Sequence, residues 1–215
     1  MVIGIVGGIA SGKSTVARLF ESFGAYLIDA DRIGHETLLR PSIREKLVER
    51  FGSGILASDG LIDRQALGRI IFGDESARQA LNQFVRPTIR AEIRERIRTI
   101  QKADADRVIV VDAPLLVETG PTDIADIVLL VTAPAALRKT RVIKRNILSD
   151  AEAEKRVSAQ VSEEKQRRWV DDILENTGSI EELEQQATRL WSMLTQPKGS
   201  ERVQIGSAIG QTSNP

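Results

Sequence analysis

Short apolar stretches, separated by segments of helical periodicity, organise this chain. Nearly continuous runs of Val, Ile and Leu of this length are typical of strands that are buried on both faces of a parallel sheet. The predicted strands are residues 2–6, 25–29, 107–112, 126–131 and 171–175. Because helical segments lie between them, we expect an α/β fold in which a parallel sheet is covered by helices.

Two helices of this expected fold have clear sequence signals. Val16, Leu19, Phe20 and Phe23 recur as on one helix face, and Gly24 ends that helix. Near the other end of the chain, a capping box opens a helix whose apolar residues share one face. The box residues and the apolar positions are Ser179, Glu182, Leu183, Ala187, Leu190, Trp191 and Leu194.

Two intervals are too long for simple connections between strands. Residues 32–104 contain three helical signals. Apolar residues with helical periodicity end at Gly52, a second helical stretch follows the cap residue Asp63, and isoleucines at 89, 93, 97 and 100 indicate a third helix. This insertion follows the second strand at the carboxyl side of the sheet, where α/β enzymes bind ligands, so we expect it to bind an acceptor substrate. Residues 134–168 contain ten Lys and Arg residues and are expected to form a basic helical lid.

The segment between the first strand and the first helix contains a phosphate-binding motif. Gly7 to Ser14 reads GGIASGKS, the GxxxxGK[ST] spacing of a P-loop. Glycines let the backbone N–H groups surround a polyphosphate, Lys13 reaches the β- and γ-oxygens, and Ser14 ligates Mg²⁺. The predicted triphosphate-binding residues are Gly8, Ile9, Ala10, Ser11, Gly12, Lys13, Ser14 and Thr15.

Carboxylates follow two of the predicted strands. If the chain stays extended through the DAD stretch, Asp29 and Asp31 project from the same side of the strand. One carboxylate could accept the proton of an acceptor hydroxyl while the other holds a metal. Alternatively, the DAD stretch could be a solvent-exposed turn that ends the strand. Asp112 ends the third strand like a Walker B aspartate, which holds Mg²⁺, although an apolar strand can also end in Asp by chance.

His35 is the single histidine of the chain, four residues after Asp31. On a helix the two side chains would face the same way, so His35 is a candidate substrate contact. The alternative is an ordinary surface or packing residue.

Composition narrows the class of protein. Thirty basic residues balance thirty acidic ones, which argues against a nucleic-acid or anionic-membrane partner, and no obligate protein partner is evident. The chain has no cysteine, which excludes disulfides and thiolate metal sites. Without a recognisable signal peptide or a membrane-length apolar run, we expect a cytoplasmic enzyme.

The motifs GGIASGKST, LIDADRIGHE, DAPLLVE at 112–118 and ILENTG at 173–178 together resemble the dephospho-coenzyme A kinase family over roughly residues 1–195. The resemblance implies that the γ-phosphoryl group of ATP is transferred to the ribose 3′-hydroxyl of dephospho-coenzyme A, which is the last step of coenzyme A biosynthesis. The catalytic residues it implies are Asp31, Lys13 and Arg145. It further implies lid contacts from Arg141 and Arg145, an adenine-side contact from Asn176, and acceptor contacts from Asp29, Asp31, His35, Pro114 and Leu115. The chain departs from the family pattern at Arg86, where His usually precedes the proline, and at Arg138, where Gln is common.

A single P-loop kinase domain over residues 1–195 is therefore expected, with a disordered tail at 196–215. Its core would comprise residues 1–31, 105–133 and 169–195, its acceptor-binding insertion 32–104 and its lid 134–168.

Two other functions remain open from the residues themselves. One is a P-loop kinase that acts on a nucleoside monophosphate or another small metabolite. The other is a P-loop ATPase switch, although the chain lacks the guanine-reading NKxD motif.

Overall fold

The computed structural model describes residues 1–114, 116–117, 122–146, 149–150, 154 and 163–195, with the backbone alone at 145 and 146. The predicted tail, residues 196–215, lies outside this part of the chain. The strands are β1 (Val2–Val6), β2 (Tyr26–Asp29), β3 (Ile109–Asp112), β4 (Ile127–Thr132) and β5 (Asp172–Glu175). The helices are α1 (Lys13–Ser22), α2 (Ala30–Leu38), α3 (Pro41–Phe51), the short 3₁₀ helix η1 (Ser53–Ile55), α4 (Arg64–Gly73), α5 (Glu75–Ala103), α6 (Ala135–Asn146), α8 (Glu163–Arg167) and α9 (Ile180–Thr195).

The five strands form one parallel sheet in the order β2-β3-β1-β4-β5. All five predicted strands and the parallel α/β class are thereby confirmed, with strand ends shifted by a residue or two. β1 lies in the centre, so the loop that follows it opens at the carboxyl edge of the sheet. The register places Asp29 of β2 directly opposite Asp112 of β3, which brings two of the predicted carboxylates to this edge.

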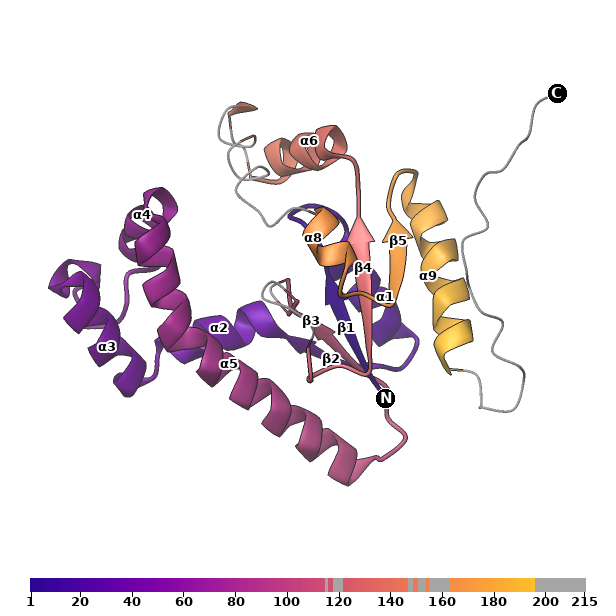
Figure 1. Cartoon of the computed structure of the whole chain (residues 1–215), viewed down its shortest axis with the longest axis horizontal. Helices are drawn as coiled ribbons and strands as arrows, with labels where there is room; N and C mark the ends of the chain where they lie inside the picture. The colour runs from indigo at the N-terminus through magenta and orange to yellow at the C-terminus, as the bar shows by residue number, and fades with distance from the viewer. Residues whose placement is uncertain (115, 118–121, 147–148, 151–153, 155–162, 196–215) are drawn as a thin grey trace.

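Both faces of the sheet are covered by helices, because successive side chains of a strand point to opposite faces. In β1, Val2 and Val6 pack with residues of α2 and α5, whereas Ile3 and Ile5 pack with residues of α1 and α9. Figure 1 shows α9 along one side of the sheet and α5 crossing on the other. The buried strands therefore hold the P-loop between two packed layers.

Helix α5 links the sheet to a second, smaller hydrophobic cluster. Its residues Ile93 and Ile97 are buried against the sheet, whereas Val85 belongs to a cluster with residues of α3, η1 and α4. The helices α3 and α4 consequently stand away from the sheet at the N-terminal end of α5 (Figure 1). Helix α5, which runs for 29 residues, therefore connects this helical group to the sheet.

Several local signals in the sequence correspond to observed helix ends. The Asp63 side chain accepts hydrogen bonds from the first backbone N–H groups of α4, and Gly52 ends α3 with a φ of 83°. In the capping box of α9, Glu182 N–H donates to Ser179 Oγ and Ser179 N–H donates to Glu182 Oε2. No helix in the described residues is long and apolar enough to cross a membrane.

The expectation that the chain stays extended through Asp31 is wrong. β2 ends at Asp29 and α2 begins at Ala30, so Asp31 lies in the first turn of a helix. The Asp29 carboxylate accepts a 3.0 Å hydrogen bond from the backbone N–H of Arg32 and so caps α2. Asp is among the best N-cap residues, which explains why a helix starts here. Asp29 and Asp31 therefore belong to different elements.

Candidate active site

The P-loop joins β1 to α1 in a conformation that two of its glycines make possible. Gly7 and Gly12 have φ values of 140° and 107°, which residues with side chains rarely adopt. A Cβ atom on Gly7 would lie 2.1 Å from the carbonyl oxygen of Val131, and one on Gly12 would lie 2.3 Å from Asn176 Nδ2. The loop is therefore packed tightly against β4 and the segment after β5.

Lys13 is held at the beginning of α1. Its ammonium group donates a 3.0 Å hydrogen bond to the carbonyl oxygen of Gly8. Burial lowers the pKa of Lys13, the carboxylates of Asp112 and Asp31 oppose that shift, and the Arg138 guanidinium adds to it. The lysine is thus a partly desolvated cation facing two carboxylates, an arrangement suited to a polyanionic ligand.

Ser14 and Asp112 meet on the other side of the loop. Ser14 Oγ donates a 3.1 Å hydrogen bond to Asp112 Oδ2. Burial raises the pKa of Asp112; Lys13 and the Ser14 hydroxyl oppose this shift, while Asp31 and Asp29 add to it. Oδ1 of Asp112 is buried and, within the described part of the chain, accepts no hydrogen bond. A hydroxyl oxygen beside an unsatisfied carboxylate oxygen fits the oxygen preference of Mg²⁺.

Among the described residues there is no group of three or more His, Cys, Asp or Glu side chains that could hold a metal ion. Such a group is not required for Mg²⁺, which usually binds through one or two protein ligands, waters and substrate phosphates. Ser14 and Asp112 are therefore the residues that could hold Mg²⁺ if phosphate oxygens and water supply the remaining ligands.

A cavity of about 510 Å³ opens over the P-loop. It brings together residues of β3, α1, α2, α6 and α9. The lining residues are Ile9, Ala10, Gly12, Lys13, Ser14, Thr15, Asp31, Asp112, Pro114, Arg141, Asn176, Ile180 and Leu183. Asp31, which comes from α2, thus faces the same space as the P-loop lysine.

Asn176 ties the segment after β5 to the P-loop. Its side-chain Nδ2 donates a 2.8 Å hydrogen bond to the carbonyl oxygen of Ser11, and its Oδ1 accepts one of 3.1 Å from Arg141. Arg141 also donates to the carbonyl oxygen of Ala10 at 3.3 Å. Because both polar ends of the Asn176 amide are engaged with protein groups, its contacts in this structure position the P-loop and Arg141.

Some predicted site residues do not line this cavity. Asp29 caps α2, and His35 Nε2 lies 2.7 Å from Nη2 of Arg64, the first residue of α4. Gly8 and Ser11 contribute backbone carbonyl groups that bind Lys13 and Asn176. Leu115 and the Arg145 side chain lie outside the described residues.

Two apolar residues of the cavity and one cation were not anticipated as site residues. Ile180 and Leu183 of α9 line the end of the cavity that Asn176 and Arg141 also line. Ile180 is the first residue of α9 and leaves 48% of its surface exposed. The first turn of a helix is usually polar, so an apolar residue at this position is the signal in the sequence that could have marked Ile180 as a site residue. Arg138 of α6 acts electrostatically on Lys13, whereas the sequence indicated it as one of the ten basic residues of the lid and as a departure from the family pattern.

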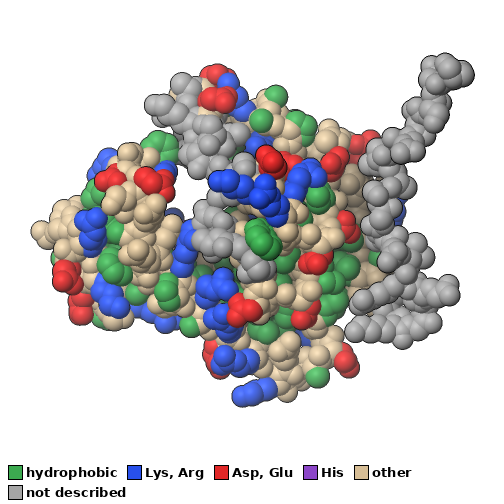
Figure 2. Space-filling model, viewed as in Figure 1, with side chains coloured by type: hydrophobic (Ala, Val, Ile, Leu, Met, Phe, Trp, Pro, Cys, Tyr) green, Lys and Arg blue, Asp and Glu red, His purple; other side chains and the backbone are tan. Residues whose placement is uncertain are grey.

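Figure 2 shows Lys and Arg side chains on both sides of the hollow between the α3–α4 group and the rest of the molecule. The chain carries no net charge, so this positive surface is a local feature.

Comparisons with known proteins agree on one kind of enzyme. The family profile described as dephospho-CoA kinase matches residues 1–182. A protein named dephospho-CoA kinase from Moorella thermoacetica is 41% identical over 195 residues, covering 90% of this chain and 92% of the relative. A crystal structure from Thermus thermophilus is similar with a TM-score of 0.74 and 35% identity, covering 91% of this chain and 98% of that one. The dephospho-CoA kinase of Campylobacter jejuni is similar with a TM-score of 0.57 and 28% identity, covering 88% and 94% of the two chains.

Proposed function

The chain belongs to the dephospho-CoA kinase family, and on that premise we propose how its residues carry out the reaction. The enzyme transfers the γ-phosphoryl group of ATP to the ribose 3′-hydroxyl of dephospho-CoA, which gives CoA and ADP in the last step of CoA biosynthesis. One observation supports the assignment of roles most strongly. Asp31, Lys13 and Asp112 line the same cavity although they come from three different elements.

The P-loop and α1 are proposed to bind the triphosphate of ATP. Their backbone N–H groups and the positive end of α1 favour anions, and the Lys13 ammonium would bind the β- and γ-oxygens. Arg141 lines the same cavity from α6, and Arg145 follows it by one helical turn on that helix. Both arginines are proposed to stabilise the negative charge of the phosphoryl group during transfer.

Ser14 and Asp112 are proposed as the residues that would hold Mg²⁺ beside the triphosphate of ATP. When bound, the ion supplies positive charge next to the leaving phosphate oxygens. The unsatisfied Oδ1 atom of Asp112 and its contact with the Ser14 hydroxyl support this choice of ligands.

Asp31 is proposed to activate the acceptor. Its carboxylate accepts the proton of the ribose 3′-hydroxyl while the hydroxyl oxygen forms a bond to the γ-phosphorus. The bond between the γ-phosphorus and the bridging oxygen breaks, and ADP leaves with that oxygen. Lys13 keeps its proton throughout and opposes the charge on the transferred group.

The apolar end of the cavity is proposed to bind the adenine base of ATP. Ile180 and Leu183 offer an apolar surface next to Asn176 and Arg141. In this proposal Asn176 affects nucleotide binding in two ways: it positions the P-loop, and it lies next to the adenine base. Residues 134–168, which carry Arg141, are proposed to close over the bound nucleotide and exclude water.

Residues 32–104 are proposed to bind dephospho-CoA, with Asp29, His35, Pro114 and Leu115 contributing to the acceptor side. His35 is included because it lies on α2, one turn after Asp31.

We further propose that the enzyme acts in the cytoplasm, without an obligate protein partner, nucleic acid or membrane. A chain that contains no cysteine needs no oxidising compartment, and the purified chain alone is expected to be active.

Measuring ADP release by the purified chain tests this function. The reaction is run without an acceptor, with dephospho-CoA, and with nucleoside monophosphates and other small alcohols at the same concentration. Dephospho-CoA is expected to stimulate ADP release far more than any other acceptor, and the product is expected to carry a new 3′-phosphate. ADP release that does not depend on an acceptor would instead indicate an ATPase switch, and a preference for another acceptor would indicate a different small-molecule kinase.

A further inference from the structure

Helix α6 packs on the P-loop through a small apolar cluster of its own. Val142 of α6 is 1% exposed and packs against Ile143 of the same helix and against Ile9 and Ala10 of the P-loop. Among the described side chains of α6, none belongs to the clusters that cover the sheet or join α3 and α4 to α5. Figure 1 shows α6 beyond the carboxyl ends of the strands, apart from α5 and α9. The P-loop is therefore the apolar support on which α6 rests.

The P-loop has an unusual backbone conformation at this contact. Ala10 has a φ of 57°, and it is the one residue other than glycine with a positive φ in the part of the chain that the structure describes. Residues with a Cβ atom rarely adopt this conformation, which persists where surrounding contacts hold it. Two such contacts come from α6: Val142 packs against the Ala10 side chain, and Arg141 donates a 3.3 Å hydrogen bond to the Ala10 carbonyl oxygen. Two successive residues of α6 thus hold Ala10.

The same contact fixes the position of Arg141. Its guanidinium group lines the P-loop cavity and reaches the Ala10 carbonyl oxygen and, at 3.1 Å, Asn176 Oδ1. An arginine side chain is long and loses much rotamer freedom when it is held at one point, so the position of its backbone matters. Val142 is the next residue along α6, and its buried side chain fixes the helix against the loop at that point. The guanidinium group is thus placed at the cavity in the ligand-free protein.

We propose that Val142 is a positioning residue for ATP, which packs α6 against Ile9 and Ala10 and so holds Arg141 at the cavity before ATP binds. This inference rests on the proposed function, in which Arg141 stabilises the negative charge of the phosphoryl group. Val142 is not among the described residues that line the cavity, so it acts through Arg141 and does not touch the nucleotide. A cation that is ordered in advance loses less conformational freedom when ATP binds, which strengthens binding.

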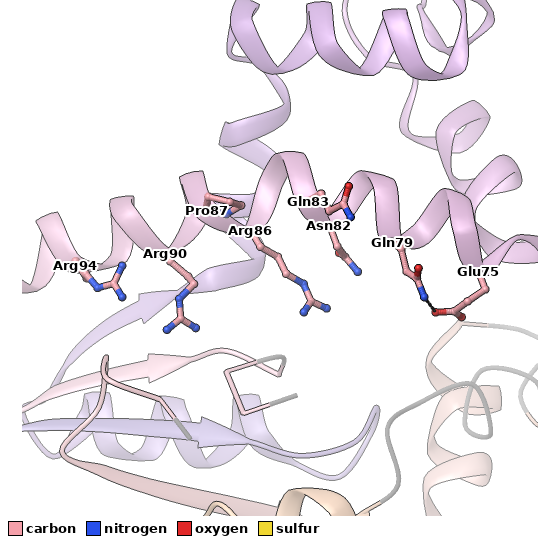
Figure 3. A pocket seen from close by; sticks show the side chains of 8 residues that line it. All are labelled: Glu75, Gln79, Asn82, Gln83, Arg86, Pro87, Arg90 and Arg94. Carbon is pink, nitrogen blue, oxygen red and sulfur yellow. Dashed lines mark hydrogen bonds between the residues drawn. The ribbon is translucent and has the colours of Figure 1, made fainter. Parts of the chain in front are cut away.

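Binding of the acceptor provides an internal control for this role. A second cavity, of about 720 Å³, lies on one face of α5, within the insertion that is proposed to bind dephospho-CoA (Figure 3). The described residues that line it all belong to α5, so neither Val142 nor the P-loop contributes to it. A change that loosens α6 from the P-loop should therefore weaken the binding of ATP and leave the binding of dephospho-CoA unchanged. A general loss of folded structure would weaken both.

A double-mutant cycle of Val142→Ala and Arg141→Met tests this role, with the dissociation constant for ATP measured by calorimetry. In the native background, Val142→Ala is expected to raise that constant roughly tenfold, because a displaced guanidinium group loses charged hydrogen bonds to the phosphates. In the Arg141→Met background, the same change is expected to add less than about twofold, because the group that Val142 positions is then absent. If Val142 only stabilised the fold, it would change the constant by the same factor in both backgrounds.

Leu137→Ala is the matched control. Leu137 is an apolar residue of the same helix, but it does not belong to the Val142 cluster or line the P-loop cavity. This variant is expected to bind ATP and dephospho-CoA as the native chain does. Thermal melting is measured for every variant. If Val142→Ala is not folded at the temperature of the assay, Val142→Thr gives the reading, because it keeps the branched shape and places a hydroxyl group in the apolar cluster. The same dependence on Arg141 is expected for it.

Three results would overturn the proposal. They are native affinity for ATP in Val142→Ala, an equal factor in the two backgrounds, and an equal loss of affinity for ATP and dephospho-CoA. The proposed function fails separately, if the native chain binds ATP but does not phosphorylate dephospho-CoA. In that case the cycle still decides whether Val142 acts through Arg141, because it is measured on ATP binding alone.

Discussion

Asn176 Nδ2 donates a 2.8 Å hydrogen bond to the carbonyl oxygen of Ser11, which lies 165 residues earlier in the chain. Ser11 is completely buried, and Asn176 is 5% exposed. The bond fixes the P-loop from the segment after β5, and Asn176 Oδ1 fixes Arg141 of α6 at the same time. One amide therefore joins the two segments that are proposed to bind the phosphates of ATP.

Replacing Asn176 by Ala is expected to weaken ATP binding more than dephospho-CoA binding. The substitution leaves the Ser11 carbonyl without its donor, which typically costs about 1–3 kcal/mol of stability for a buried group. We expect the KM for ATP to rise roughly tenfold, since the loop is no longer held in its binding conformation. Gln186→Ala is the control, because this partly exposed amide near β5 donates to the Glu175 carbonyl and does not line the P-loop cavity. A normal KM for ATP in Asn176→Ala would show that the loop holds its shape without this bond.

The sequence predicted the sheet well because buried strands and helix caps are local signals. The apolar run of β1, the Asp63 cap and the Ser179–Glu182 box each act within a few residues, so their structural effect can be read from neighbouring positions. The same local logic explains the error at DAD. The DAD pattern predicts an extended acidic pair, although an Asp before a helical segment is also a good N-cap.

The parts of the site that depend on distant contacts could not be predicted. The bond between Asn176 and Ser11 exists because β5, β4 and β1 are arranged in a particular order in the sheet, which no local pattern specifies. The ion pairs of Asp123 with Arg90 and Arg94 likewise join segments about thirty residues apart. In contrast, the sequence predicts Lys13, Ser14, Asp31 and Asp112 as candidate site residues, because their motifs have short, characteristic spacings.

Lys13→Met is expected to abolish most of the activity without destabilising the fold. The developing charge on the transferred phosphoryl group would lose its cation, which typically costs roughly a hundredfold to a thousandfold in kcat. Because burial lowers the pKa of Lys13, the native fold disfavours its charged form. The uncharged methionine should therefore melt at the native temperature or above. Near-native kcat at saturating ATP and dephospho-CoA would contradict the role of Lys13.

Asp112→Asn is expected to raise the Mg²⁺ concentration needed for half-maximal activity by roughly tenfold or more, since Mg²⁺ prefers charged oxygen ligands. The folded-state pKa of Asp112 is raised above its ordinary value of 3.8. Ionisation of this carboxyl group therefore lowers the stability of the ligand-free fold, and the loss is complete once the pH has risen through the raised pKa. The neutral Asn variant should therefore melt no lower than native at pH 7. Ser14→Ala should shift the Mg²⁺ dependence in the same direction. An unchanged Mg²⁺ dependence in both variants would remove these residues from the metal site.

Arg96→Gln is expected to make the chain less stable at neutral pH but not at low pH. Arg96 of α5 binds Glu36 of α2 at 2.7 Å and Glu92 at 3.0 Å, and its hydrogen bonds lower the pKa of both glutamates below the ordinary value of 4.5. A lowered folded-state pKa adds stability above the ordinary value, and this stability is lost as pH falls through the lowered one.

Thermal melting between pH 7 and pH 3 tests this linkage. The melting temperature of Arg96→Gln is expected to lie below native at pH 7 and to converge with native as the glutamates become protonated. Arg98→Gln removes an arginine whose side chain is 63% exposed and pairs with Glu95 on its own helix, so it should follow the native curve throughout. A constant difference between Arg96→Gln and native at every pH would mean that the arginine stabilises by packing and not by its ion pairs.

Asp31 and Asp29 form a matched pair for testing acceptor activation. They are two residues apart, but Asp31 lines the P-loop cavity whereas Asp29 caps α2. Asn caps a helix about as well as Asp does, so Asp29→Asn should retain the α2 conformation and most of the activity. Asp31→Asn keeps the size of the side chain but removes the base that accepts the hydroxyl proton.

The most direct measurement is the single-turnover rate of phosphoryl transfer from ATP to dephospho-CoA in Asp31→Asn, with Asp29→Asn and the native chain beside it. Loss of a general base typically lowers such a rate by roughly a hundredfold to ten-thousandfold. We predict a loss of this size in Asp31→Asn, native affinity for ATP, and no recovery at high Mg²⁺, together with a rate within about tenfold of native in Asp29→Asn. A native transfer rate in Asp31→Asn would contradict the proposed activation of the 3′-hydroxyl by Asp31.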